Sequence, residues 1–127
     1  MKKLAITMGD PGGVGPEIIV QSLADERIRR LCVPIVIGDV RMISRALRLF
    51  RNPLTLREIG SPGEAVSGGE YLNIMSMRNA GMSDRPVTKP TTAGGEASVR
   101  YISKAVELAM LKQIDGIVTA PIAKEAL

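Results

Sequence analysis

The sequence predicts an α/β fold in which a largely parallel β-sheet is flanked by helices. Short apolar runs alternate with segments of helical periodicity along the 127 residues, which is the order that right-handed βαβ units require. The first apolar run leads into a loop rich in glycine and proline, GDPGGVGPE at residues 9–17, and then into a helical segment. A second junction of this kind, TAPIAK, occupies residues 119–124. Because the chain has no Trp, two Tyr and one Phe, its core must be aliphatic.

Each expected strand is a short apolar run, and most are bounded by Gly, Pro, Asn or Asp. The expected strands are residues 2–8, 33–37, 54–59, 71–75 and 114–119. The first and the last are apolar enough to be buried strands. Residues 60–69 form a connection rich in Gly, Pro and Ser, and residues 78–95 show little periodicity, which predicts a long surface excursion.

Helical periodicity predicts helices at residues 16–24, 40–50 and 96–111, with a further turn at 25–31. Pro16 and Pro121 each suit the first position of a helix, where the missing N–H costs nothing, so Pro121 is expected to start a last helix. Asp39 suits the N-cap of the second helix. The expected apolar stripes are Val40, Ile43, Leu47 and Phe50 in the second helix and Ile102, Ala105, Val106 and Ala109 in the third.

Composition and charge narrow the function classes. The single cysteine, Cys32, excludes an internal disulfide and indicates a reducing compartment, and no apolar run is long enough to span a membrane. We therefore expect a cytoplasmic protein without a membrane partner. The net charge is +4, and Arg41, Arg45 and Arg48 share one face of a helix, where they could contact nucleic acid. The sequence has no base-stacking aromatic set, helix-turn-helix signature or Cys/His zinc module, which favours a solvated helix face and no nucleic-acid partner.

The glycine-rich loop is a candidate binding site because the first N–H groups of a helix lack intrahelical partners. Its candidate residues are Gly9, Asp10, Gly12, Gly13, Gly15 and Glu17. The glycine spacing matches neither the dinucleotide-binding fingerprint nor the P-loop, and Asp10 and Glu17 would repel a phosphate. The loop therefore suits a ribose hydroxyl, an amide or a cation better than a pyrophosphate. A purely structural turn, in which glycine supplies φ > 0 and close approach, is the alternative.

The loop after the last strand places a hydroxyl, on Thr119, and an amine, on Lys124, at another strand-to-helix junction. Ligands of open parallel sheets bind at the carboxyl ends of strands, and Lys124 lies one turn into the expected helix. Both are candidate site residues, and the alternative for Lys124 is an ordinary solvated lysine. The chain has no His and one Cys, so it offers no metal-ligand set of the imidazole or thiolate type.

Three segments taken together resemble a known enzyme family. GDPGGVGPEI, GGEASVRYISKAVELA and IDGIVTAPIAKEAL are similar to the 4-hydroxythreonine-4-phosphate dehydrogenases of vitamin B6 biosynthesis and to relatives that oxidise phosphorylated threonate or erythronate. The first segment also resembles a turn of isopropylmalate and isocitrate dehydrogenases, which share that family's fold. By this resemblance, the six residues of the glycine loop lie beside a nicotinamide cofactor. Thr119, Pro121 and Lys124 match a Thr-x-Pro-x-x-Lys signature at the edge of the catalytic cleft.

The resemblance implies that NAD or NADP takes a hydride from a phosphorylated hydroxy acid, 4-phosphooxy-L-threonine, whose oxidised product loses CO₂. It also implies a divalent metal (Zn, Mg or Co) held by histidines, of which this chain has none. The metal ligands and the family's Gly-His-Thr-Glu substrate motif are therefore expected beyond Leu127. We expect residues 1–127 to be the N-terminal portion of a larger two-domain α/β dehydrogenase, a homodimer when complete and inactive as this portion alone. The alternatives are a dehydrogenase of 4-phospho-D-threonate or erythronate, or a short non-catalytic module that binds a nucleotide or a partner.

Overall fold

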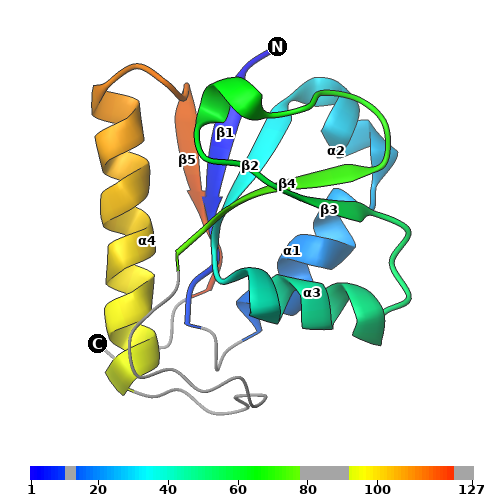
Figure 1. Cartoon of the computed structure of the whole chain (residues 1–127), viewed down its shortest axis with the longest axis horizontal. Helices are drawn as coiled ribbons and strands as arrows, with labels where there is room; N and C mark the ends of the chain where they lie inside the picture. The colour runs from blue at the N-terminus through cyan, green and yellow to red at the C-terminus, as the bar shows by residue number, and fades with distance from the viewer. Residues whose placement is uncertain (11–13, 78–91, 122–127) are drawn as a thin grey trace.

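The computed structural model describes residues 1–10, 14–77 and 92–121, with the side chains of residues 92–95 left aside. Its strands form one five-stranded sheet in the order β3-β4-β2-β1-β5, and every strand pair is parallel (Figure 1). The strands are β1 (Lys3–Thr7), β2 (Val33–Gly38), β3 (Thr55–Glu58), β4 (Tyr71–Ser76) and β5 (Gly116–Thr119). The predicted fold class, a parallel sheet with flanking helices, is confirmed.

Helices cover the sheet from both sides. They are α1 (Gly15–Leu23), α2 (Glu26–Leu31), α3 (Val40–Leu49) and α4 (Thr92–Met110), with a short 3₁₀ turn, η1, at Pro62–Glu64. Helices α1 and α3 pack against each other, whereas α4 packs on β1, β5 and β2. Figure 1 shows α4 on the other side of the sheet from α1 and α3. Right-handed crossovers require this arrangement, because the chain moves from β1 to β2 in one direction and from β4 back to β5 in the other.

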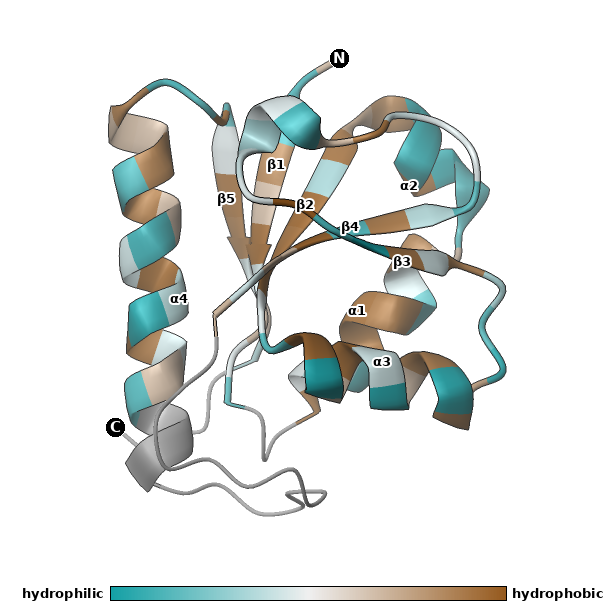
Figure 2. Cartoon of the chain, viewed as in Figure 1, coloured by the Kyte–Doolittle hydropathy of each residue, from teal (hydrophilic) through white to brown (hydrophobic). Residues whose placement is uncertain are grey.

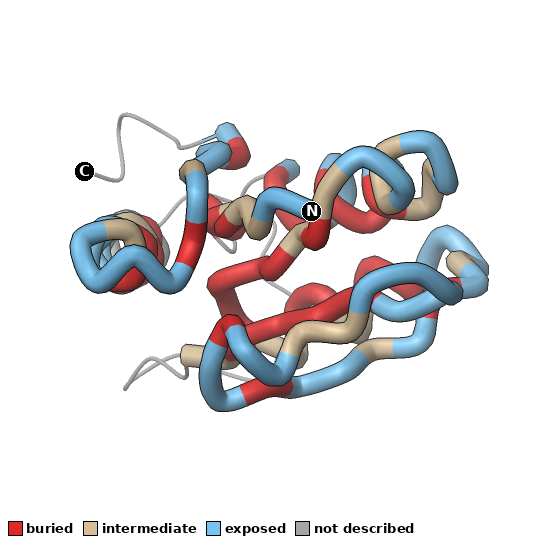
Figure 3. Tube along the Cα trace, turned by 90° about the horizontal axis from the view of Figure 1, so that it is seen from above, coloured by how far each residue is buried: buried red, intermediate tan, exposed pale blue. Residues whose placement is uncertain are grey.

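The core lies along the central strands. Ile35, Val36 and Ile37 of β2 are fully buried, and Figure 2 shows the apolar residues gathered on the strands and on the inward faces of the helices. Figure 3 shows the buried segments toward the middle of the molecule and the exposed segments toward its outside. The expectation that residues 114–119 form a buried strand is wrong, because β5 is an edge strand. Ile117 and Val118 are 38% and 48% exposed.

Two helices differ in detail from the expectation. In α3 the buried stripe is Met42, Ile43, Ala46 and Leu47. Val40 is only half-buried and Phe50 is exposed, because these residues stand at the two ends of the helix. In α4 the buried face is Ala97, Ser98, Tyr101, Ala105 and Leu108, while Val106 is exposed. This helix starts at Thr92 rather than at residue 96. Packing of the fully buried Tyr101 face outweighs the low helix propensity of Gly94 and Gly95.

Candidate functional site

The parallel strands end at one edge of the sheet, and the chain segments that follow them meet there (Figure 1). Strand β1 runs into Gly9 and Asp10, and β5 runs into Ala120 and Pro121. Backbone bonds prolong the ladder beyond the strands: the Met8 N–H donates to the Ile37 carbonyl at 2.9 Å, and the Ala120 N–H donates to the Thr7 carbonyl at 3.0 Å. The two loops that the sequence singled out therefore lie side by side on neighbouring strands.

Close backbone approach explains two of the glycines, one between the two loops and one within the turn from β1 into α1. Gly9 has a φ of +79°, and a Cβ there would overlap the carbonyl oxygen of Pro121. A Cβ on Gly15 would overlap the carbonyl oxygen of Met8 and would lie 3.4 Å from the Cβ of Ala120. The turn can approach the end of β5 this closely only because Gly9 lacks a side chain, and α1 can start this close to Met8 only because Gly15 lacks one. The glycine motif and the terminal motif thus form one structural site.

Polar groups at this site differ in their access to solvent. Asp10 is fully buried, whereas Glu17 is exposed. Glu17 lies in the first turn of α1, where its negative charge interacts favourably with the helix dipole. Val14 is the N-cap of α1, and its side chain accepts no hydrogen bond from the first N–H groups of the helix. Thr119 is exposed at the mouth of the junction. The acid in the loop that suits direct contact with a ligand is therefore Glu17, and Asp10 suits a role in holding the loop.

Thr7 adds a polar group that the sequence analysis did not single out. Its hydroxyl oxygen is buried and has no hydrogen-bond partner among the described residues. Buried hydroxyls are costly without a partner. Thr7 is the last residue of β1 and pairs in register with Thr119 of β5. A hydroxyl that follows the apolar residues Leu4–Ile6 just before a glycine loop is the signal that could have identified it.

A second polar group lies where β2 ends. Asp39 is fully buried and caps α3, as predicted: its carboxylate accepts the Arg41 N–H at 2.8 Å. The Arg41 guanidinium also binds this carboxylate, through Nε at 3.1 Å and Nη2 at 2.8 Å. The neighbouring Val40 N–H donates to the Ser76 hydroxyl at the end of β4, at 3.2 Å. The expectation of a solvated face for all three arginines is therefore wrong for Arg41, because Asp39 draws it to the carboxyl edge of the sheet.

Several predicted site residues lie outside the described residues, namely Gly12, Gly13 and Lys124. Within residues 1–10, 14–77 and 92–121, no group of three or more His, Cys, Asp and Glu side chains is arranged to hold a metal ion. In the same ranges, no helix combines the length and the apolar character needed to cross a membrane.

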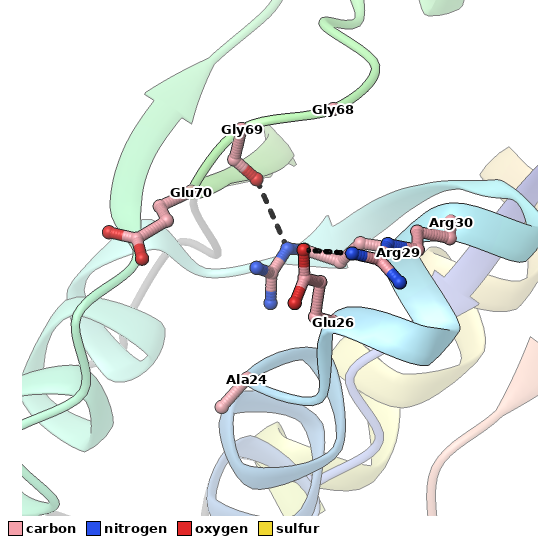
Figure 4. A pocket seen from close by; sticks show the side chains of 7 residues that line it. All are labelled: Ala24, Glu26, Arg29, Arg30, Gly68, Gly69 and Glu70. Atoms are coloured by element: carbon pink, nitrogen blue, oxygen red, sulfur yellow. Dashed lines mark hydrogen bonds and ion pairs between the residues drawn. The ribbon is translucent and has the colours of Figure 1, made fainter.

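A separate cavity of about 490 Å³ lies beside α2 and the loop before β4 (Figure 4). Its arginines are already engaged. Arg29 donates from Nε to the Gly69 carbonyl at 3.1 Å and from Nη1 to the Leu23 carbonyl at 2.7 Å, and Arg30 pairs with Glu26 at 2.8 Å. Arg29 thus joins α2 both to the loop that leads into β4 and to the end of α1, at the end of the sheet opposite the glycine loop.

Comparison with known proteins identifies relatives. The family model for "Pyridoxal phosphate biosynthetic protein PdxA" matches residues 30–127. The chain is 42% identical to a 4-hydroxythreonine-4-phosphate dehydrogenase of Trichlorobacter lovleyi and 45% identical to a D-threonate 4-phosphate dehydrogenase of Cupriavidus necator, each over 126 residues. Both alignments cover 98% of this chain, but only 38% and 37% of the relatives. The chain thus spans less than half the length of these curated relatives.

Solved structures give the same result. The crystal structure of a 4-hydroxythreonine-4-phosphate dehydrogenase from Burkholderia phymatum superposes with a TM-score of 0.92 at 35% identity, covering 99% of this chain and 38% of the other. That from Klebsiella pneumoniae gives a TM-score of 0.87 at 35% identity, covering 99% of this chain and 39% of the other. These neighbours have the isocitrate dehydrogenase-like fold, so the predicted resemblance to part of that fold is confirmed.

Proposed function

Because this chain belongs to the PdxA family of pyridoxal phosphate biosynthetic proteins, we propose that it is the N-terminal portion of a two-domain, NAD- or NADP-dependent dehydrogenase. The complete protein oxidises the hydroxyl of 4-phosphooxy-L-threonine, and the β-keto acid formed then loses CO₂. The observation that carries the proposal is the contact of Gly9 with Pro121, since it joins the two family-like motifs at the carboxyl edge of the sheet. Ligands of open parallel sheets bind at that edge.

The proposed roles follow from position and burial. Gly9 and Gly15 let the cofactor-side loop pack closely on the backbones of Pro121 and Met8. Gly12 and Gly13, between them in the motif, keep side chains away from the cofactor, and the N-terminal N–H groups of α1 bind its polar groups. Glu17 suits a ribose hydroxyl because it is exposed, and the buried Asp10 holds the loop in place. The exposed hydroxyl of Thr119 and the amine of Lys124 orient the substrate. When bound, NAD or NADP accepts the hydride from the alcohol carbon.

The metal does not fit the residues present. The sequence contains no histidine, and the described residues contain no group of three His, Cys, Asp and Glu side chains suited to a metal ion. The ligands for Zn, Mg or Co in the complete protein would therefore come from outside residues 1–127. We also propose that the complete protein is a cytoplasmic homodimer, as the family resemblance implies.

The direct test is NADH or NADPH formation by the complete polypeptide with 4-phosphooxy-L-threonine and added divalent metal. Thr119→Ala and Lys124→Ala should each lower kcat/KM by about 100-fold or more, because each removes a group that orients the substrate. Lys2→Ala is the matched control, since Lys2 is exposed near the opposite end of β1, and it should leave turnover unchanged. Full turnover in both site variants would show that the carboxyl edge of the sheet is not the active site.

A second substrate has its own support. The identity to the D-threonate 4-phosphate dehydrogenase, 45%, is slightly higher than the 42% to the 4-hydroxythreonine-4-phosphate dehydrogenase. We therefore propose 4-phospho-D-threonate as the alternative substrate, oxidised at the same edge of the sheet. The same assay decides between them, because the true substrate should have the higher kcat/KM by at least about tenfold.

A further inference from the structure

The cavity between α2 and the loop before β4 has the size and the charge of a site for a small polar molecule. Its volume of about 490 Å³ falls within the range of about 300–1,000 Å³ that is typical of small-molecule sites. The charged residues of its lining are Glu26, Arg29, Arg30 and Glu70, so both signs of charge are present in equal number. Because the cavity lies at the opposite end of the sheet from the glycine loop, it is separate from the candidate site.

Arg29 is held in one orientation, and one of its nitrogen atoms is left for a ligand. Nε and Nη1 donate to the carbonyls of Gly69 and Leu23, at 3.1 and 2.7 Å. Within the described part of the chain, Nη2 makes no hydrogen bond or ion pair. In the view of Figure 4, this guanidinium lies between Glu70 and the paired Arg30 and Glu26. A guanidinium that two carbonyls already fix loses little conformational entropy on binding a third group, so Nη2 suits an anionic oxygen of a ligand.

Glu70 supplies a negative charge from the loop side of the cavity. Its carboxylate forms no hydrogen bond or ion pair with any residue that the structure describes. Its backbone is fixed, because the Glu70 carbonyl accepts the Thr55 N–H at 2.7 Å. Gly68, two residues earlier, has a φ of +77°, and nothing lies within 4 Å of a Cβ built on it, so the loop leaves open space there. One cavity therefore presents a guanidinium nitrogen and a carboxylate that do not pair with each other.

We propose that this cavity binds a free α-amino acid, whose carboxylate accepts hydrogen bonds from Arg29 Nη2 and whose ammonium group donates to Glu70. A phosphate or a simple cation would meet a like charge on one wall, whereas a zwitterion meets an opposite charge on both. The Arg30–Glu26 pair, 2.8 Å apart on the remaining wall, offers a donor and an acceptor to an uncharged polar side chain. The inference does not depend on the proposed dehydrogenase activity, because the cavity is remote from the carboxyl edge of the sheet.

Titration calorimetry of the complete polypeptide with L-glutamine tests the proposal. L-glutamine is the probe because it is a zwitterion whose side-chain amide both donates and accepts hydrogen bonds. We expect one molecule bound per chain, with a Kd of about 1 mM. N-acetyl-L-glutamine lacks the ammonium group, and L-glutamine amide lacks the carboxylate. Each analogue should bind at least about tenfold more weakly, because each loses one charge-assisted contact.

One pair of variants assigns the binding to this cavity. Glu70→Gln keeps the size of the side chain but removes its charge, so it should weaken L-glutamine binding about tenfold. Glu58→Gln is the matched control, because Glu58 is also exposed but lies outside the cavity, on β3, and it should leave the Kd unchanged.

Three results would overturn the inference: no heat of binding at about 10 mM L-glutamine, equal binding of N-acetyl-L-glutamine, or an unchanged Kd in Glu70→Gln. The last result would place the bound L-glutamine elsewhere on the protein. Binding that depends on Glu70 in a protein that forms no NADH would support the cavity as an amino-acid site and count only against the proposed activity.

Discussion

The β1–β5 junction and the loop that leads into β4 both depend on glycine, but for different physical reasons. At the junction, Gly9 combines a φ of +79° with a lack of space, and Gly15 lacks space alone. In the loop before β4, Gly68 has a φ of +77°, yet nothing lies within 4 Å of a Cβ built on it. The comparison distinguishes the need for a left-handed backbone conformation from the need for space. Of these two regions, the β1–β5 junction is the one in which a glycine lets two backbones touch.

The largest effect is expected for Gly9→Ala, because this change combines both costs. An Ala at a positive φ is destabilised by about 1–2 kcal/mol, and forcing its Cβ against the Pro121 carbonyl adds about 1–3 kcal/mol. We therefore expect the free energy of unfolding of the complete polypeptide to fall by about 4 kcal/mol in urea denaturation. A loss no greater than that of Gly68→Ala would show that the two loops do not touch.

An intermediate effect is expected for Gly15→Ala. Helix propensity by itself favours Ala by about 1 kcal/mol, but the added Cβ would overlap the carbonyl oxygen of Met8, directly after β1. Overpacking of about 3 kcal/mol outweighs the propensity gain, so the net loss of unfolding free energy should be about 2 kcal/mol. Gln21→Ala, on the exposed face of α1, is the control for propensity and should change stability by only a few tenths of a kcal/mol. A stabilised Gly15→Ala variant would contradict the close approach.

Much of the fold could be predicted because it depends on local patterns. Alternating apolar runs and helical segments identify a parallel sheet, and the Asp39 cap follows from one residue type before a helix. The exposure of β5 was missed, because an apolar run such as GIVT predicts a buried strand and does not report that the strand lies at the edge of the sheet. The start of α4 was missed for a related reason: Gly94 and Gly95 indicate a break locally, and only the packing of Tyr101 against the sheet overrides them.

The candidate site shows the same limit. The two motifs were recognisable separately, but the contact between Gly9 and Pro121 joins residues at opposite ends of the sequence and follows only from the strand order β2-β1-β5. The role of Arg41 was missed because helical spacing groups it with Arg45 and Arg48, whereas a buried carboxylate two residues earlier decides its orientation. Sequence periodicity describes one helix at a time and does not report which neighbouring group is desolvated.

The smallest effect is expected for Gly68→Ala, which tests conformation without contact. An Ala at this left-handed φ lowers the free energy of unfolding by about 1–2 kcal/mol. The reduced conformational freedom of the unfolded chain raises it by about 0.4–1 kcal/mol. The net loss of stability should therefore be below about 1.5 kcal/mol. Gly68→Asn should lose less, because Asn tolerates this region better than Ala. Gly63→Ala is the matched control: Gly63 has no positive φ, and the nearest atom to its added Cβ is the Ser61 hydroxyl oxygen at 4.0 Å. Urea denaturation should give this variant unchanged or slightly raised stability. If Gly68→Ala were as damaging as Gly9→Ala, strain alone would account for both glycines, and the steric explanation of the β1–β5 junction would fail.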